Sequence, residues 1–183
     1  MPVVAFNALP PNARVWVFAS DRPLGRDESE VLLEEVDRFL DQWKAHGAPL
    51  RSAREWRDDR FLVVGVDPTA EQASGCSIDG LFRALRALEG PLSTVLVAGG
   101  RVFYRDPKGS VRMQPRREVP TMTERGHLTA DTPVFDTSLT DAMSYRERFE
   151  LPARDSWVAA LMKSQASQSA NRSATNASSV RKG

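Results

Sequence analysis

The order of its periodic apolar segments is the feature that most constrains the fold of this chain. Two segments, Asp27 to His46 and Ser77 to Glu89, repeat apolar residues at spacings of three and four, as an amphipathic helix does. Shorter apolar runs with strand character precede and follow each of them. We predict strands at Arg14–Ala19, Arg51–Trp56, Arg60–Asp67, Thr94–Ala98 and Arg101–Tyr104. Alternation of this kind predicts a mixed α/β fold.

The order β-α-β-β-α-β is that of the split βαβ unit of ferredoxin-like folds. We therefore predict a ferredoxin-like α/β sandwich over residues 12–113, extended by a hairpin at Gly99-Gly100. A small C-terminal α/β appendage follows over residues 114–163. Its predicted elements are helices at Val119–Gly126, Thr140–Phe149 and Asp155–Met162 and a strand at Thr132–Phe135. Residues 164–183 are rich in Ser, Ala and Asn and cannot bury enough apolar surface to fold, so we predict a disordered tail.

Composition excludes several classes of protein. A chain of 183 residues that is 41% hydrophobic can bury its own core. Its 25 basic and 24 acidic residues give no overall charge that would favour a nucleic acid or a membrane surface. The single cysteine, Cys76, rules out an intramolecular disulfide. Since we find neither a signal peptide nor an apolar run of about 18 residues, we expect a cytoplasmic protein.

Short motifs along the chain carry a family resemblance. They are Asn12-Ala-Arg-Val-Trp-Val-Phe18, Gln42-Trp-Lys-Ala-His-Gly47, Arg60-Phe-Leu-Val-Val64 and Ser74-Gly-Cys-Ser-Ile-Asp79, with weaker matches at Asp131-Thr-Pro-Val-Phe135 and Asp155-Ser-Trp157. They resemble a family of small, uncharacterised bacterial proteins whose members often carry the label "ABC transporter ATPase". The likeness spans roughly Asn7 to Leu161, and it implies a fold unit rather than an activity.

The ATPase label can be tested on the residues themselves. A P-loop requires the pattern Gly-x-x-x-x-Gly-Lys-Ser/Thr, so that backbone N–H groups and a lysine surround the phosphates. No stretch of the chain has this pattern, and Lys108-Gly109-Ser110 lacks both the first glycine and a following helix. We therefore reject the ATPase interpretation.

The main candidate site is the turn Ser74-Gly75-Cys76-Ser77, which we expect just before the second predicted helix. The N–H groups and the dipole of a helix start favour a thiolate and can hold an anion. The plain alternative is a small buried cysteine packed against the sheet, with Ser77 as an N-cap and Gly75 present for its backbone angles.

Three further residues could act with this turn. His46 is a candidate base for the Cys76 thiol, although a histidine at a helix C-terminus also suits the helix dipole. Asp79, or Ser77, would then orient that base. Asp67 and Asp79 flank one loop and could serve acid–base chemistry or hold a cation, or they could be a loop cap and a first-turn acid. One cysteine and two histidines give no zinc spacing, so we expect no metal and no cofactor.

Arginines and aromatic residues alternate in part of the chain. They are Arg14, Arg51, Arg54, Arg57 and Arg60, interleaved with Trp16, Trp56 and Phe61. Such residues on a ferredoxin-like sheet can stack on RNA bases, but the aromatic pattern of RNA-recognition motifs is missing. Outside the tail, 22 basic residues face 24 acidic ones. We therefore expect no nucleic-acid partner.

The sequence leaves three functions open. We favour a non-enzymatic binding or accessory module with a protein partner, because the sequence contains no complete catalytic constellation. The second is a thiol-dependent or redox-active enzyme that uses Cys76. The third is a receptor for a small anionic ligand at Gly75-Cys76-Ser77.

Overall fold

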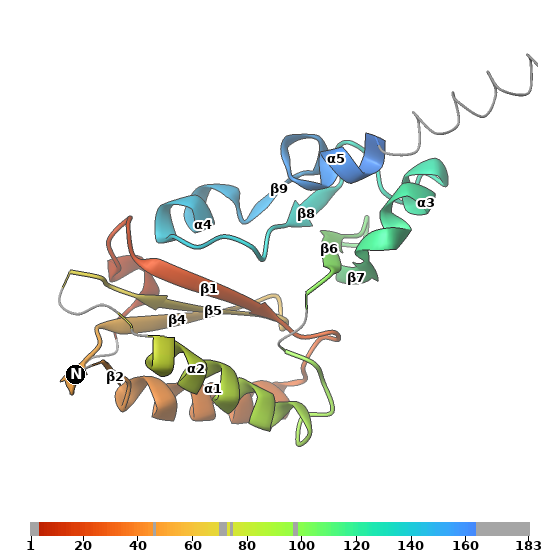
Figure 1. Cartoon of the computed structure of the whole chain (residues 1–183). Helices are drawn as coiled ribbons and strands as arrows, with labels where there is room; N and C mark the ends of the chain where they lie inside the picture. Colours follow the sequence, from red (N-terminus) through yellow and green to blue (C-terminus); the bar gives the residue numbers. More distant parts are fainter. Residues whose placement is uncertain (1–3, 46, 70–72, 74, 97–98, 164–183) are drawn as a thin grey trace, which may run out of the picture. The chain divides into compact units, whose positions relative to one another are not determined.

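The computed structural model describes residues 4–45, 47–69, 73, 75–96 and 99–163, and these form two compact units (Figure 1). The first unit comprises residues of Met1–Gly99 together with Thr137–Phe149. The second unit comprises residues of Gly100–Asp136 together with Glu150–Gly183. Among the described residues, no helix has both the length and the apolar character needed to cross a membrane.

The first unit is built on a three-stranded antiparallel sheet. Its strands are β1 (Arg14–Ala19), β4 (Ser52–Arg57) and β5 (Phe61–Val66), in the order β1-β5-β4. Every residue of the central strand β5 is buried. A strand covered on both faces has a continuous apolar run instead of an alternating one, as the sequence of β5 does.

Helices cover both faces of this sheet. Helices α1 (Arg26–Asp41) and α2 (Gly75–Glu89) lie on one face, and α4 (Ala142–Arg148) lies on the other (Figure 1). The core between the sheet and the α1–α2 pair includes Val36, Leu40, Leu62, Val64, Leu81 and Leu85. These helical residues recur at three- and four-residue spacings, which place them on one side of each helix.

A glycine in β5 lets the N-terminal segment approach the face that α4 covers. A Cβ atom at Gly65 would lie 2.4 Å from Cδ1 of Leu9 and 3.2 Å from the ring of Phe6, closer than packed atoms allow. On the same face, the rings of Phe61 and Phe149 pack edge to face with centroids 5.1 Å apart. This face is therefore a second apolar layer of the first unit.

The second unit has its own sheet and core. Its elements are β6 (Arg101–Arg105), β7 (Val111–Pro115), β8 (Pro133–Phe135), β9 (Glu150–Pro152), α3 (Val119–Glu124) and α5 (Val158–Lys163). The sheet is antiparallel in the order β7-β6-β8-β9. Its core is formed by Val102, Val119, Met122, Leu128, Val134 and Val158.

Short elements complete the described chain. They are the 3₁₀ helices η1 (Phe6–Ala8), η2 (Arg116–Glu118) and η3 (Ala153–Asp155) and the two-residue strands β2 (Lys44–Ala45) and β3 (Ala48–Pro49). The β2–β3 pair explains why α1 ends at Asp41 and not at the predicted His46. Backbone groups from Lys44 onward are used in that hairpin, so they cannot continue the helix.

The structure confirms the predicted mixed α/β class, but one predicted strand is missing from the described residues. The strand predicted at Thr94–Ala98 is absent over the described part, Thr94–Leu96. There the backbone N–H of Leu96 donates to the Glu89 carboxylate at 2.8 Å, and the backbone N–H of Val95 donates to the Asp21 carboxylate at 3.2 Å. Side chains from the neighbouring loop and helix thus take up groups that a strand would use.

The two units do not follow the predicted boundary at residues 113 and 114. The β6–β7 hairpin belongs to the second unit, because β6 also pairs with β8. Residues Thr137–Phe149 return to the first unit, where the N–H of Ala142 donates to the carbonyl of Ala13 at 2.9 Å. The predicted tail, 164–183, lies outside the described residues.

Candidate functional site

The start of α2 carries most of the residues that the sequence singles out. The helix begins at Gly75, so Cys76 lies in its first turn instead of in front of it, and Ser77 is not the N-cap. Gly75, Cys76 and Asp79 are exposed to solvent, while Ser77 is half-buried. The alternative of a cysteine buried against the sheet is therefore wrong.

Trp43, two residues after the end of α1, bonds the start of α2 to the rest of the first unit. The Nε1–H of Trp43 donates to the backbone carbonyl of Ser77 at 3.0 Å. Trp43 itself is buried, and its ring packs against Phe39 and Trp16 with centroids 5.4 and 6.0 Å apart. This bond ties the first turn of α2 to the aromatic cluster, because the donating indole is buried in that cluster.

A cation and an indole from β1 complete this region. The Arg14 guanidinium lies over the ring of Trp16, 4.8 Å from its centroid. Arg14 is exposed and Trp16 is half-buried, and no described carboxylate pairs with Arg14. We name the set Arg14, Trp16, Gly75, Cys76 and Ser77 the helix-start surface. The guanidinium and the first turn of a helix favour an anionic group, and the partly exposed indole adds apolar contact area.

Asp67 belongs to a different cluster. Its carboxylate accepts hydrogen bonds from the N–H and the hydroxyl of Thr69 at 2.9 and 2.6 Å, and it pairs with Arg51 at 2.9 Å. The bonds from Thr69, assisted by the Arg51 guanidinium, lower the pKa of Asp67 below its usual value. All of these bonds hold the loop after β5, and Asp79 takes no part in them. His46, the candidate base for Cys76, lies outside the described residues.

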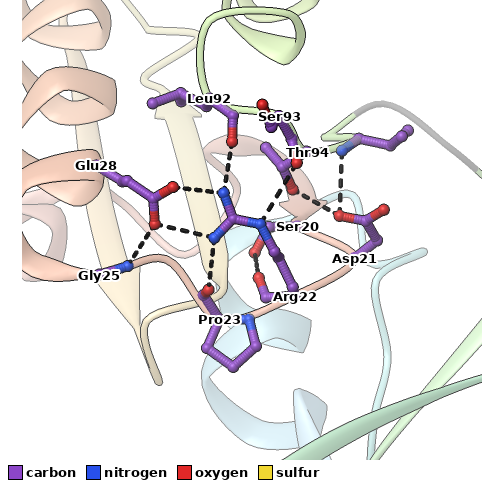
Figure 2. Close-up of polar contacts among 10 residues, drawn as sticks. Ser20, Asp21, Arg22, Pro23, Gly25, Glu28, Leu92, Ser93 and Thr94 are labelled. Carbon is purple, nitrogen blue, oxygen red and sulfur yellow. Dashed lines mark hydrogen bonds and ion pairs between the residues drawn. The ribbon is translucent and has the colours of Figure 1, made fainter.

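The opposite end of α2 is closed by a polar network that the sequence analysis did not anticipate (Figure 2). The Arg22 guanidinium pairs with both carboxylate oxygens of Glu28 and donates to the carbonyl oxygen of Leu92 at 2.6 Å. Asp21 accepts from the Thr94 hydroxyl at 2.6 Å and from the Val95 N–H at 3.2 Å. The loop between β1 and α1 therefore holds the segment that follows α2.

Glu28 has a strongly shifted pKa in this network. Its hydrogen bonds from the Arg22 guanidinium, and then from the Gly25 N–H at 2.8 Å, lower the pKa of Glu28 from its ordinary value of 4.5 to about 2. Both bonds favour the charged form of the carboxylate. We call Asp21, Arg22, Glu28, Leu92 and Thr94 the Arg22 network. Because the members of this network bond to one another, we interpret it as a structural feature that holds the loop before α1 against the segment after α2.

A third polar cluster lies on the α4 side of the sheet. The hydroxyl of Tyr145 donates to Oε2 of Glu55 at 2.5 Å, and the tyrosine is almost fully buried. Burial, followed by the bond to Glu55, raises the pKa of Tyr145 well above its usual range. A tyrosine held neutral in this way anchors α4 to β4, since the hydroxyl keeps its donor.

The sequence provides only part of the signal for these arrangements. The alternation of Arg14 with Trp16 is visible in the sequence, and the structure shows that the two side chains stack. Arg22 and Leu92 are 70 residues apart, and no local spacing connects them. Among the described residues, no group of three or more His, Cys, Asp and Glu side chains could hold a metal ion.

Comparison with known proteins adds no relative to this picture. The chain matches no family model, no curated protein and no solved structure.

Proposed function

We propose that this protein is a non-enzymatic binding or accessory module of the bacterial cytoplasm, and that a protein partner docks on the helix-start surface. The observation that carries the proposal is the exposed Arg14 guanidinium stacked on Trp16, together with the exposed residues Gly75 and Cys76 at the start of α2. Tryptophan and arginine are enriched in the residues that carry binding energy at interfaces. In the same unit, Arg22 and Arg51 are paired with Glu28 and Asp67.

The chemistry of this surface favours a partner that presents a carboxylate or another anionic group. Arg14 supplies a cation that no described carboxylate neutralises. The dipole of α2, a helix of fifteen residues, adds partial positive charge at Gly75 and Cys76. The bond from Trp43 to Ser77 holds the two halves of the surface in a fixed arrangement, which lowers the entropic cost of binding.

A pull-down with charge-reversal variants tests this proposal. We expect the wild-type chain to retain a reproducible partner, Arg14→Glu to lose it, and Cys76→Ala to keep it. Arg83→Glu is the matched control, because Arg83 is an exposed arginine of α2 outside the helix-start surface. The proposal fails if no partner is reproducible, or if Arg14→Glu retains the partner as well as Arg83→Glu does.

A thiol-dependent or redox-active function is a second proposal, favoured by the exposure of Cys76. It requires a thiol that ionises more readily than a free cysteine, whose pKa is about 8.5. Because Cys76 is the single cysteine of the chain, iodoacetamide labelling reports on it alone. A labelling rate whose pH midpoint lies well below that of a free thiol supports this function. A pH midpoint equal to that of a free thiol excludes it. The participation of His46 and Asp79 remains part of this proposal.

A receptor for a small anion at Gly75-Cys76-Ser77 is the third proposal, and Arg14 favours it for the same electrostatic reason. A ligand that binds only the folded state raises the unfolding temperature. We expect inorganic phosphate or citrate to stabilise the wild-type chain more than Arg14→Ala, at equal ionic strength. Equal stabilisation of both chains would exclude this site.

We also infer a ferredoxin-like origin for the first unit and membership of the family that its motifs resemble. The order β1-β5-β4, in which the first strand lies beside the third, supports the ferredoxin-like arrangement. That arrangement requires a fourth strand beside β1. An experimental structure in which residues around 97–98 pair with β1 would support the inference, and a different neighbour along the whole of β1 would contradict it.

A further inference from the structure

One edge of the sheet in the second unit is strand β7, whose outward backbone groups have no partner in the described chain. Strand β7 is the first in the order β7-β6-β8-β9 and pairs only with β6. The bonds that flank this pair join Arg116 to Gly100 and Asp106 to Ser110, at 2.9 Å each. In an antiparallel pair, alternate residues point their N–H and C=O groups to opposite sides. The even-numbered residues of β7 therefore bond to β6, and the odd-numbered residues face outward.

The outward residues are Val111, Met113 and Pro115. Two N–H groups and three carbonyl groups thus line an open edge, of the kind that adds a strand from another chain. We infer that this edge pairs with the same edge of a second copy of this chain, in an antiparallel and two-fold symmetric manner, to form a continuous sheet of eight strands across the dimer.

The side chains of β7 favour one register of that pairing. When Met113 lies opposite Met113 of the second copy, Val111 faces Pro115, and Arg112 faces Gln114. Apolar residues then meet apolar ones, and no arginine faces an arginine. A register centred on Arg112 would place two guanidinium groups directly opposite each other, and a register centred on Gln114 would place Arg112 opposite Arg116. Like charges opposite each other destabilise a strand pair, so the Met113-centred register is preferred.

The same register accommodates the proline at the end of the strand. The Val111 N–H donates to the carbonyl of Pro115, and the Met113 residues exchange two bonds, so the symmetric pair has four backbone bonds. Proline lacks an N–H, so each Val111 carbonyl faces no donor in β7 of the second copy. The charge of Arg112 is balanced by Asp106 at 2.7 Å, which reduces repulsion between the copies. A short edge of this kind makes a weak dimer that depends on concentration.

Cross-linking at single positions tests the register in the full chain. In a Cys76→Ala background, we expect Met113→Cys to form an intermolecular disulfide under mild oxidation. The Cα atoms of a directly bonded pair lie about 5.5 Å apart, within disulfide range. Arg112→Cys is the matched control, one residue away, and it should cross-link poorly. Equal or better cross-linking of Arg112→Cys would overturn the inference.

Sedimentation of substituted chains provides a test that needs no cysteine. We expect the wild-type chain to associate reversibly at concentrations up to about 1 mM, the range of weak complexes. Gln114→Glu, which faces Arg112 across the dimer, should tighten association, and Gln114→Arg should weaken it by about tenfold. A chain that stays monomeric throughout this range, or identical association of the two variants, would overturn the inference.

Discussion

The two ends of α2 differ in how their polar groups are used. At its start, Gly75 and Cys76 are exposed, and Trp43 joins Ser77 of the same turn to Trp16, on which Arg14 stacks. At its end, the Arg22 network closes the following segment against the loop that precedes α1. The difference shows which polar groups of this unit are available to bind a partner. Groups that satisfy one another inside the fold contribute to stability, whereas groups left in solvent are available to a partner.

Core substitutions at the two ends should have the largest effect and test whether both ends are equally packed. Leu81, near the start, and Leu88, near the end, are both buried. We expect Leu81→Ala and Leu88→Ala each to lower the free energy of unfolding by about 3 kcal/mol, since each leaves a cavity. Urea unfolding followed by tryptophan fluorescence measures this. If only Leu88→Ala destabilises the chain, the start of α2 is not part of the core.

The closed end should be weakened by loss of a single acceptor. Asp21→Ala removes the oxygen that accepts from Thr94 and Val95 and leaves the buried Thr94 hydroxyl without this bond. We expect a loss of about 1 kcal/mol in the free energy of unfolding. Glu34→Ala, at an exposed acid of α1, is the control and should change it by less than about 0.5 kcal/mol. Equal effects would show that the Asp21 contacts do not stabilise the fold.

Acid should destabilise the Arg22 network at the C-terminal end of α2 before it affects the start of the helix. Because the folded pKa of Glu28 lies near 2 and its ordinary value is 4.5, its pairing with Arg22 stabilises the fold fully above pH 4.5. That contribution is lost as the pH falls from 4.5 toward 2. The urea midpoint should therefore drop more between pH 5 and pH 3 in the wild-type chain than in Glu28→Gln. Parallel profiles would contradict this assignment.

The smallest effect is expected at the open end. Cys76 is exposed, so Cys76→Ala removes little buried surface and should change the free energy of unfolding by less than about 0.5 kcal/mol. Chemical denaturation under reducing conditions measures this. A loss above about 1 kcal/mol would mean that the sulfur packs against the fold, and the contrast between the two ends of α2 would then disappear.

Local spacing in the sequence was sufficient for most of the secondary structure. Strand β1 has the predicted bounds Arg14–Ala19, and α2 ends at the predicted Glu89. Helix and strand periodicities are properties of neighbouring residues, so they can be read from a short window. One predicted strand failed because side chains from other segments bond its backbone N–H groups. Thr94–Leu96 is the example, because the Asp21 and Glu89 carboxylates accept from the backbone N–H groups of Val95 and Leu96, which a strand would need.

The sequence by itself determined the alternation of helices and strands and the mixed α/β class. Tertiary structure alone decided that Cys76 is exposed and that Trp43 holds Ser77, 34 residues away. It also decided that Arg22 closes the far end of the same helix. The physical reason is the sequence separation over which each interaction acts. Backbone conformation follows local periodicity, but burial and hydrogen-bond partners depend on which distant segments the hydrophobic core brings together.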